Sequence, residues 1–167
     1  MSSAEDGYVA QYEREVPIEL RSADASDQPS EIGALEAIRV KLMLKGELTR
    51  PVGLRVELSS ETNLFFHYTH TMDERGFVSL QEDQNLMVPF PDYYSVILRM
   101  LNACIKQPHK QLAVFIMKAD GTARLDFIQV CTLCRENIKC VQLYVRMHTH
   151  IYLCIPICMY FIDADSL

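Results

Sequence analysis

The residues of this chain that could do chemistry are mostly cysteines and histidines, and they gather in its last part. Five of the six cysteines lie within residues 130–167. Thiolates and imidazoles suit tetrahedral zinc, so a zinc site is one open interpretation of this tail. The tail holds a single C-x-x-C pair followed by irregular spacing, which is a weak zinc pattern. The candidate ligands are Cys131, Cys134, Cys140, His148 or His150, Cys154 and Cys158.

The first 129 residues offer few groups suited to catalysis. Cys104 could act as a nucleophile with His109 close in sequence, but it lies beside an apolar helical row and is interpreted as a buried thiol. His67 and His70 are three residues apart on an expected strand. That spacing places them on opposite faces, so they cannot share a metal ion.

Two adjacent acidic pairs, Asp73–Glu74 and Glu82–Asp83, do not resemble a general acid–base pair, because neighbouring residues on a helix diverge by about 100°. The sequence contains no Gly-rich phosphate loop, no G-x-S-x-G elbow and no H-E-x-x-H motif. We therefore predict a protein that is not an enzyme and binds no cofactor.

Strands are predicted through the first half of the chain. Residues 38–44 and 54–58 alternate apolar and polar side chains, which is typical of a strand with one buried face. Residues 8–20 form an earlier strand, placed at a sheet edge by Pro17, and residues 64–70 form an aromatic strand. The short connections favour antiparallel pairing.

Two helices and a hairpin follow these strands. Thr71–Glu74 fits a capping box that starts a helix ending near Asn85. A second helix is predicted over residues 91–106, and residues 112–127 form a hairpin. The predicted fold class is α+β: a small antiparallel β-barrel or sandwich with an inserted pair of helices.

One set of apolar side chains is expected to fill the space between the sheet and the helices. These residues recur with a period of two on strands and at spacings of three and four on helices. The predicted core consists of Leu54, Val56, Phe66, Tyr68, Phe77, Leu98, Leu101, Val114, Ile116 and Phe127.

Length and charge restrict the class of protein further. The 167 residues fit one domain, and their formal net charge is −6. Residues 1–31 hold eight acidic residues against two basic ones, so the remainder of the chain is neutral overall. A neutral body has no basic surface that would attract nucleic acid or an anionic membrane.

Residues 1–7 lack the features of a signal peptide and are expected to be disordered. One cysteine in residues 1–129 suits a reducing compartment, the cytoplasm.

Four segments, which follow one another in the order and spacing of the family, resemble the N-terminal head domains of the spindle assembly abnormal protein 6 family. These head domains form the centriolar cartwheel. The resemblance covers residues 8–129, with Asn85 where the family has Gly and Pro89 where it has Asp. The sequence of residues 57–88 is more similar to that of a shorter paralogue, called the "like" form, which lacks the coiled-coil stalk. The segments are Val52–Leu58, Asn63–Tyr68, Asp73–Leu80 and Asn85–Phe90.

The resemblance implies a structural scaffold in the cytoplasm and cytoskeleton. Family heads pair with one another by placing an apolar side chain from a hairpin tip into a partner pocket, and so curve into rings. The partners implied are a second copy of the chain and other proteins of the centriole, the basal body or a related flagellar or apical structure. No nucleic acid or membrane partner is implied. The other open hypothesis is an interaction module with a zinc-binding tail.

The family pattern stops at Gln129. The self-association aromatic is not recognisable after that residue, so its position stays unknown. We expect residues 130–167 to be a Cys-rich tail foreign to the family, such as a translated intron. An intron begins with the bases GT, and every Val codon begins with GT, so an intron start at Val130 is compatible with the sequence. A membrane segment at Ile151–Ile162 is a weaker interpretation, because the run is short of the roughly 20 residues needed and contains Pro156. Without a family strand after Gln129, the sheet should keep an unpaired edge and the chain should assemble poorly.

Overall fold

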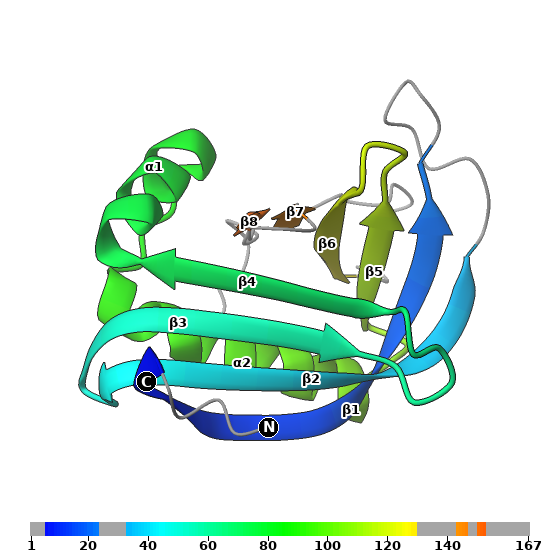
Figure 1. The fold of residues 1–167 in the computed structure, drawn as a ribbon, viewed down its shortest axis with the longest axis horizontal. Helices are drawn as coiled ribbons and strands as arrows, with labels where there is room; N and C mark the ends of the chain where they lie inside the picture. Colours follow the sequence, from blue (N-terminus) through cyan, green and yellow to red (C-terminus); the bar gives the residue numbers. More distant parts are fainter. Residues whose placement is uncertain (1–5, 24–32, 130–142, 147–149, 153–167) are drawn as a thin grey trace.

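Alternating apolar residues build an eight-stranded sheet, which the computed structural model describes over residues 6–23, 33–129, 143–146 and 150–152 (Figure 1). Within these residues the strand order is β4-β3-β2-β1-β5-β6-β7-β8. The elements are β1 (Tyr8–Ser22), β2 (Ala34–Glu47), β3 (Arg50–Ser59), β4 (His67–Asp73), α1 (Glu74–Gln84), α2 (Phe90–Lys106), β5 (Gln111–Met117), β6 (Thr122–Gln129), β7 (Leu143–Arg146) and β8 (His150–Tyr152).

The pairing of β1 with β5 differs from the predicted antiparallel barrel or sandwich. These two strands run parallel, from Ile18 opposite Ala113 to Ser22 opposite Met117. The long connection through α1 and α2 permits this arrangement, since parallel neighbours need a crossover. Pro17 directly precedes the first residue of β1 that pairs with β5, so the predicted edge position holds only for the first part of the strand.

The sheet curls until its distant strands meet. Three strands separate β4 from β5 in the sheet, yet the Phe115 ring on β5 lies 4.7 Å from the Tyr68 ring on β4 and 5.4 Å from the Phe66 ring. The chain of β8 also approaches β4. The α+β class is thus confirmed, and the predicted barrel or sandwich takes the form of one curled sheet.

The predicted unpaired edge after β6 is wrong for this structure. β7 pairs antiparallel with β6, from Thr122 opposite Arg146 to Leu125 opposite Leu143, and β8 pairs in turn with β7. The sequence could not show this pairing because residues 143–146 carry no family pattern.

The start of α1 also differs from the prediction. Thr71 belongs to β4, where it pairs with Arg55, and the N-cap is Asp73, whose Oδ1 accepts a hydrogen bond from the Gly76 N–H at 2.8 Å. Because the strand continues to Asp73, the N-cap lies two residues beyond the predicted one and the helix begins at Glu74. Its other end follows the prediction: Asn85 lies in the left-handed region, at φ 50°, and its N–H donates to the Gln81 carbonyl.

Substitutions at Asn85 test this helix end. An L-residue with a β-carbon is strained in the left-handed region, where Asn is tolerated and Gly is not strained at all. We expect Asn85→Ala to lower the free energy of unfolding by about 1 kcal/mol and Asn85→Gly to leave it unchanged or raise it slightly. Urea unfolding of the two variants measures both values. Equal losses for Ala and Gly would contradict a left-handed helix end at Asn85.

Helix α1 lies against β4 and joins α2 through aromatic rings. Phe77 of α1 lies 4.7 Å from Tyr93 and 5.5 Å from Phe90 of α2, measured between ring centroids. The buried row of α2 faces β1, β3 and β5. This packing places the main core between the sheet and the helices.

The structure places the ten predicted core residues in two environments. Leu98 is only partly buried, and Val114 and Ile116 lie in a separate buried cluster with Ala23, outside the main core. The reason is that β5 is buried on both faces, so its apolar run does not indicate a single face. The members that lie buried in the main core are Leu54, Val56, Phe66, Tyr68, Phe77, Leu101 and Phe127.

Candidate self-association surfaces

A rigid turn between β3 and β4 exposes two large apolar side chains. Residues 60–66 precede β4, so the strand predicted from residue 64 begins only at His67. Leu64 and Phe65 are 89% and 93% exposed, while the next residue, Phe66, is buried. We name Leu64 and Phe65 the tip.

The turn that carries the tip is held by its own polar groups. The buried Ser60 accepts hydrogen bonds at its Oγ from the N–H groups of Thr62 and Asn63, both at 3.2 Å. The Asn63 Oδ1 accepts from the Phe65 N–H at 3.0 Å, and the Ser60 N–H donates to the Phe66 carbonyl. These bonds hold the backbone that carries the tip.

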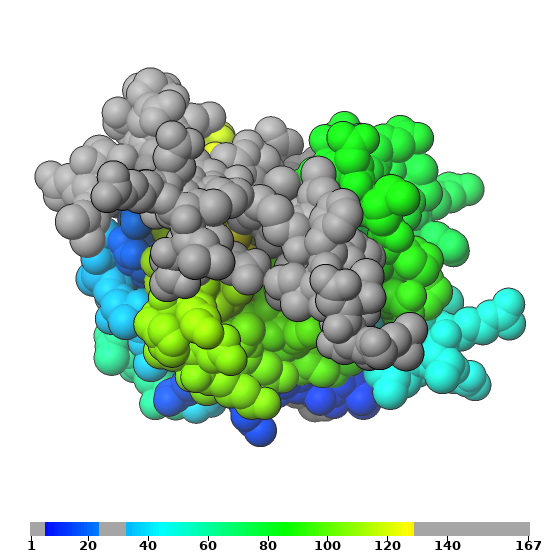
Figure 2. Space-filling model, turned by 180° about the vertical axis from the view of Figure 1, so that it is seen from behind, coloured from blue at the N-terminus to red at the C-terminus, as the bar shows by residue number. Residues whose placement is uncertain are grey.

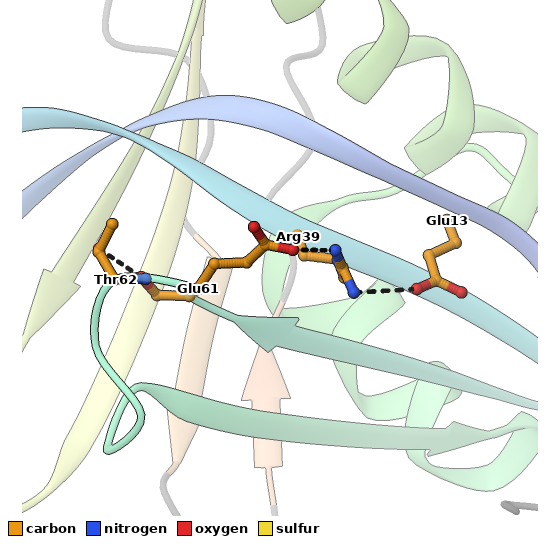
Figure 3. A network of polar contacts seen from close by, with 5 residues as sticks. Glu13, Arg39, Glu61 and Thr62 are labelled. Carbon is orange, nitrogen blue, oxygen red and sulfur yellow. Dashed lines mark hydrogen bonds and ion pairs between the residues drawn. The ribbon is translucent and has the colours of Figure 1, made fainter.

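An ion-pair network joins this turn to the sheet (Figure 3). Arg39 of β2 lies between two carboxylates, contacting Glu61 of the turn and Glu13 of β1, the latter at 3.9 Å. These side chains are solvent-exposed, so the pairs contribute little to stability. The three side chains of this network together carry one net negative charge.

A second apolar surface lies around the β2–β3 hairpin. Leu48 and Val52 of the hairpin are each 58% exposed, and Val9 on the adjoining strand β1 is 60% exposed. A β-carbon on Gly46, which has φ +92°, would lie 3.5 Å from Cγ2 of Val52, so Val52 lies beside bare backbone. We name the exposed Leu48 and Val52 of this hairpin the hairpin patch. Seen from behind, the hairpin projects from the edge of the molecule (cyan, Figure 2).

The tip and the hairpin patch lie at opposite ends of β3. The loop of the hairpin, residues 48–49, precedes Arg50, the first residue of β3, and the turn that carries the tip follows Ser59, the last. Ten residues of extended chain span about 33 Å. Figure 1 shows the hairpin and the turn toward opposite ends of the molecule's longest axis.

Chemically reactive side chains lie apart from both surfaces. Cys104 of α2 is buried, and its burial raises the pKa of the thiol to about 12, whereas His109 is exposed. His67 is exposed and His70 is fully buried, on opposite faces of β4 as their spacing predicts. Asp73 caps α1, and its sequence neighbour Glu74 is exposed.

No cluster of three or more His, Cys, Asp or Glu that could hold a metal occurs in the described part of the chain. The predicted zinc ligands Cys131, Cys134, Cys140, His148, Cys154 and Cys158 lie outside it, and so does most of Ile151–Ile162. His150 belongs to β8. Among the described helices, none has the length and apolar character needed to cross a bilayer.

Cys104 allows a test of its burial by alkylation. A thiol with a raised pKa stays protonated and unreactive at pH 8, so we expect iodoacetamide to leave Cys104 unmodified in the folded protein and to modify it after unfolding. Because the folded pKa is raised above the ordinary value, stability should fall as pH rises from about 9 toward 12. Peptide mass mapping measures the labelling. Rapid modification of Cys104 in the folded protein would contradict its buried position.

The tip was not predicted as a surface. The sequence places Phe65 among the apolar positions of a strand, and periodicity alone cannot tell an exposed aromatic residue from a buried one. The turn residues Ser60, Thr62 and Asn63 were the available signal, since Ser, Thr and Asn side chains commonly bond to nearby backbone in turns.

Comparisons with known proteins agree with this fold. The family described as the centriolar protein SAS N-terminal domain matches residues 10–138, nine residues beyond Gln129. The spindle assembly abnormal protein 6 homolog of Danio rerio is 22% identical over 112 residues, which cover 67% of this chain and 17% of that protein. The chain thus spans about a sixth of the length of that relative.

Two solved structures show the same fold. The N-terminal domain of Leishmania SAS-6 has a TM-score of 0.67 at 13% identity and covers 83% of this chain and 96% of its own. A stabilised ceSAS-6 dimer has a TM-score of 0.65 at 16% identity and covers 84% of this chain and 99% of its own. Since the family match covers well over half of the sequence, the chain belongs to the family of centriolar protein SAS N-terminal domains.

Proposed function

We propose that this protein is a non-enzymatic structural scaffold whose head domain self-associates in the assembly of a centriole, a basal body or a related flagellar or apical cytoskeletal structure. The observation that carries the proposal is the family match over residues 10–138. One solved relative of the same fold is a dimer, which supports self-association for this head. The localisation proposed is the cytoskeleton within the cytoplasm.

The surfaces of the head fit a scaffold. A scaffold head acts through repeated contacts, and a heterologous contact needs two different surfaces on one body. The tip and the hairpin patch supply two separate exposed apolar surfaces. The buried thiol of Cys104, protonated at neutral pH, is unsuited to nucleophilic chemistry.

We further propose that the chain represents the shorter, stalk-less paralogue and that the foreign tail predicted from residue 130 begins after the family match ends at residue 138. The similarity of residues 57–88 to the shorter paralogue supports the first proposal. The change in amino-acid composition after Gln129 supports the second. Sequencing the transcript across Gln129 tests both, because it gives the true continuation of the chain. A transcript that continues in frame into heptad repeats would contradict the stalk-less assignment.

Proximity labelling tests the proposed function. A biotin ligase fused to the protein should enrich structural proteins of the centriole, the basal body or the apical cytoskeleton relative to the free ligase. The matched control is the same fusion carrying Leu101→Ala, which we expect to destabilise the fold. Enrichment no different from that of the free ligase would contradict the scaffold function and favour an unrelated binding module.

A further inference from the structure

We propose that Tyr8 is a phosphorylation site that controls whether the N-terminal end of β1 stays attached to the sheet. In the unmodified protein Tyr8 holds residues 6–10, which we name the latch, on the outer face of β2 and β3, opposite the main core. A phosphoryl group on its hydroxyl oxygen releases the latch. This role adds regulation to the proposed scaffold and does not depend on it.

The ring of Tyr8 contacts a cation and bare backbone. The guanidinium of Arg55 lies over the ring, with its carbon 4.1 Å from the ring centroid, and the Lys45 ammonium lies 5.7 Å from the same centroid. Cations over an aromatic face attract the ring. A β-carbon on Gly53 would lie only 2.6 Å from the Tyr8 hydroxyl oxygen. The hydroxyl therefore occupies a notch that exists because residue 53 is glycine.

Arg55 also attaches the start of the latch to the sheet. Its Nη2 donates to Oδ2 of Asp6 at 3.1 Å, and its Nε donates to Oγ1 of Thr71 on β4 at 3.4 Å. The Arg55 side chain is largely buried by these neighbours. Both ends of the contact, Asp6 and Tyr8, thus depend on this one guanidinium.

The latch can open without the rest of the domain. Residues 8–10 pair with residues 43–45 of β2, and the register then shifts before Tyr12. Gly7, on the other side, has φ +75° and breaks the extended chain there. Val9 is 60% exposed, so opening loses little apolar contact. Short terminal segments of this kind open locally at a small cost in free energy, which allows a kinase to reach the tyrosine.

The notch disfavours a phosphate. Gly53 pairs with Asp73, so the Asp73 carboxylate follows the notch in the same row of the sheet. Burial raises the pKa of Tyr8, Arg55 lowers it, and Asp73 and Asp6 raise it, and on balance it is raised, so negative charge at this oxygen is unfavourable. A phosphate brings about 1.5 to 2 negative charges at pH 7, and beside carboxylates it disrupts the contact. The modified ring therefore leaves the notch.

The reaction is a phosphoryl transfer from ATP by a protein tyrosine kinase. The Tyr8 hydroxyl oxygen bonds to the γ-phosphorus, the bond between that phosphorus and the bridging oxygen of ADP breaks, and the hydroxyl proton passes to the catalytic carboxylate of the kinase. Glu5 and Asp6 precede Tyr8 in the sequence, which suits a kinase with a basic substrate groove.

Release of the latch uncovers an apolar side chain. Met43 of β2 is 1% exposed and belongs to neither buried cluster, and its partners in the register are Ala10 of the latch and Arg55. Opening the latch removes the first of these neighbours and leaves residues 43–45 at the edge of the sheet.

Phosphorylation of the folded chain tests the site. A purified tyrosine kinase with ATP and Mg²⁺ should modify Tyr8 in the folded protein, whereas the buried Tyr12 should be modified only in a peptide of residues 4–14. Tandem mass spectrometry locates the phosphate, and Tyr8→Phe is the control that removes the acceptor. A folded chain that stays unmodified at Tyr8 by a kinase that modifies the peptide there would overturn the proposal.

Amide hydrogen exchange measures the release. The phosphorylated chain should exchange at least about tenfold faster than the unmodified chain over residues 8–10 and 43–45, with α2 unchanged. Gly53→Ala should open the same residues without a phosphate, because its methyl group fills the notch. Adding Tyr8→Phe to Gly53→Ala should close them again in large part, because the oxygen that meets the methyl group is gone.

Each of three exchange results would overturn the proposal. The first is unchanged exchange of the latch after phosphorylation. The second is an increase that extends through α2, which would show loss of the whole fold. The third is a Gly53→Ala chain whose latch exchanges like that of the unchanged chain.

Discussion

Replacing Phe115 by Ala is expected to lower the free energy of unfolding by about 3–5 kcal/mol. The side chain is fully buried, and its ring contacts that of Tyr68 on β4, which is not a neighbour of β5 in the sheet, and that of Phe66 in the turn before β4. Its removal leaves a cavity at the place where the curled sheet closes. Urea unfolding at neutral pH measures the loss.

Phe65→Ala is the matched control for this substitution, because it removes the same side chain from an exposed site. Its effect on stability should stay within about 0.5 kcal/mol. A double-mutant cycle of Phe66→Ala with Phe115→Ala should show a coupling of about 0.5–1.5 kcal/mol, since the two rings touch edge to face. A loss at Phe115 no larger than at Phe65 would mean that the sheet does not curl as described.

Leu101→Ala and Ile116→Ala should each cost about 2–5 kcal/mol. Both residues are almost fully buried, but Leu101 belongs to the main core and Ile116 to the separate cluster on the other face of β5. Because the two sites share no cluster, the losses should add in the double variant to within about 0.5 kcal/mol.

The partly buried Leu98 provides a comparison on the same helix, and Leu98→Ala should cost less than Leu101→Ala. Losses below about 1 kcal/mol at both Leu101 and Ile116 would show that neither position belongs to a packed interior. A double variant that loses much less than the sum would instead show that the two clusters are one.

The parts of the fold that could be predicted from the sequence are those governed by local periodicity. Residues 38–44 and 54–58 alternate regularly, and the structure buries Val40, Leu42 and Val56 on the core side of neighbouring strands. Helix α2 likewise shows its buried row in its spacing, and the polar and proline residues after Lys106 mark its end. In these segments only one face is buried, so the apolar positions in the sequence are also the buried positions in the structure.

The parts that could not be predicted depend on contacts distant in sequence. The parallel pairing of β1 with β5 brings together residues nearly a hundred positions apart, and it buries both faces of β5. An apolar run such as that of β5 therefore does not reveal which residue faces which core. The pairing of β7 with β6 was likewise hidden, because the family pattern ends before those residues.

The boundary between β3, β4 and α1 shows a conflict between local signals. The aromatic residues at 64–66 favour a strand, but the hydrogen bonds of Ser60 and Asn63 hold them in a turn and move the start of β4 to His67. The same shift extends β4 to Asp73, which replaces Thr71 as the helix cap. The candidate surface at Leu64 and Phe65 exists because the turn prevailed over strand propensity.

The position of the tagged protein in dividing or flagellated cells tests the scaffold function most directly. The protein should be imaged at its natural expression level beside a marker of centrioles or basal bodies. We predict a discrete focus at a centriole, a basal body or an apical structure. A diffuse cytosolic signal without any such focus would contradict the account.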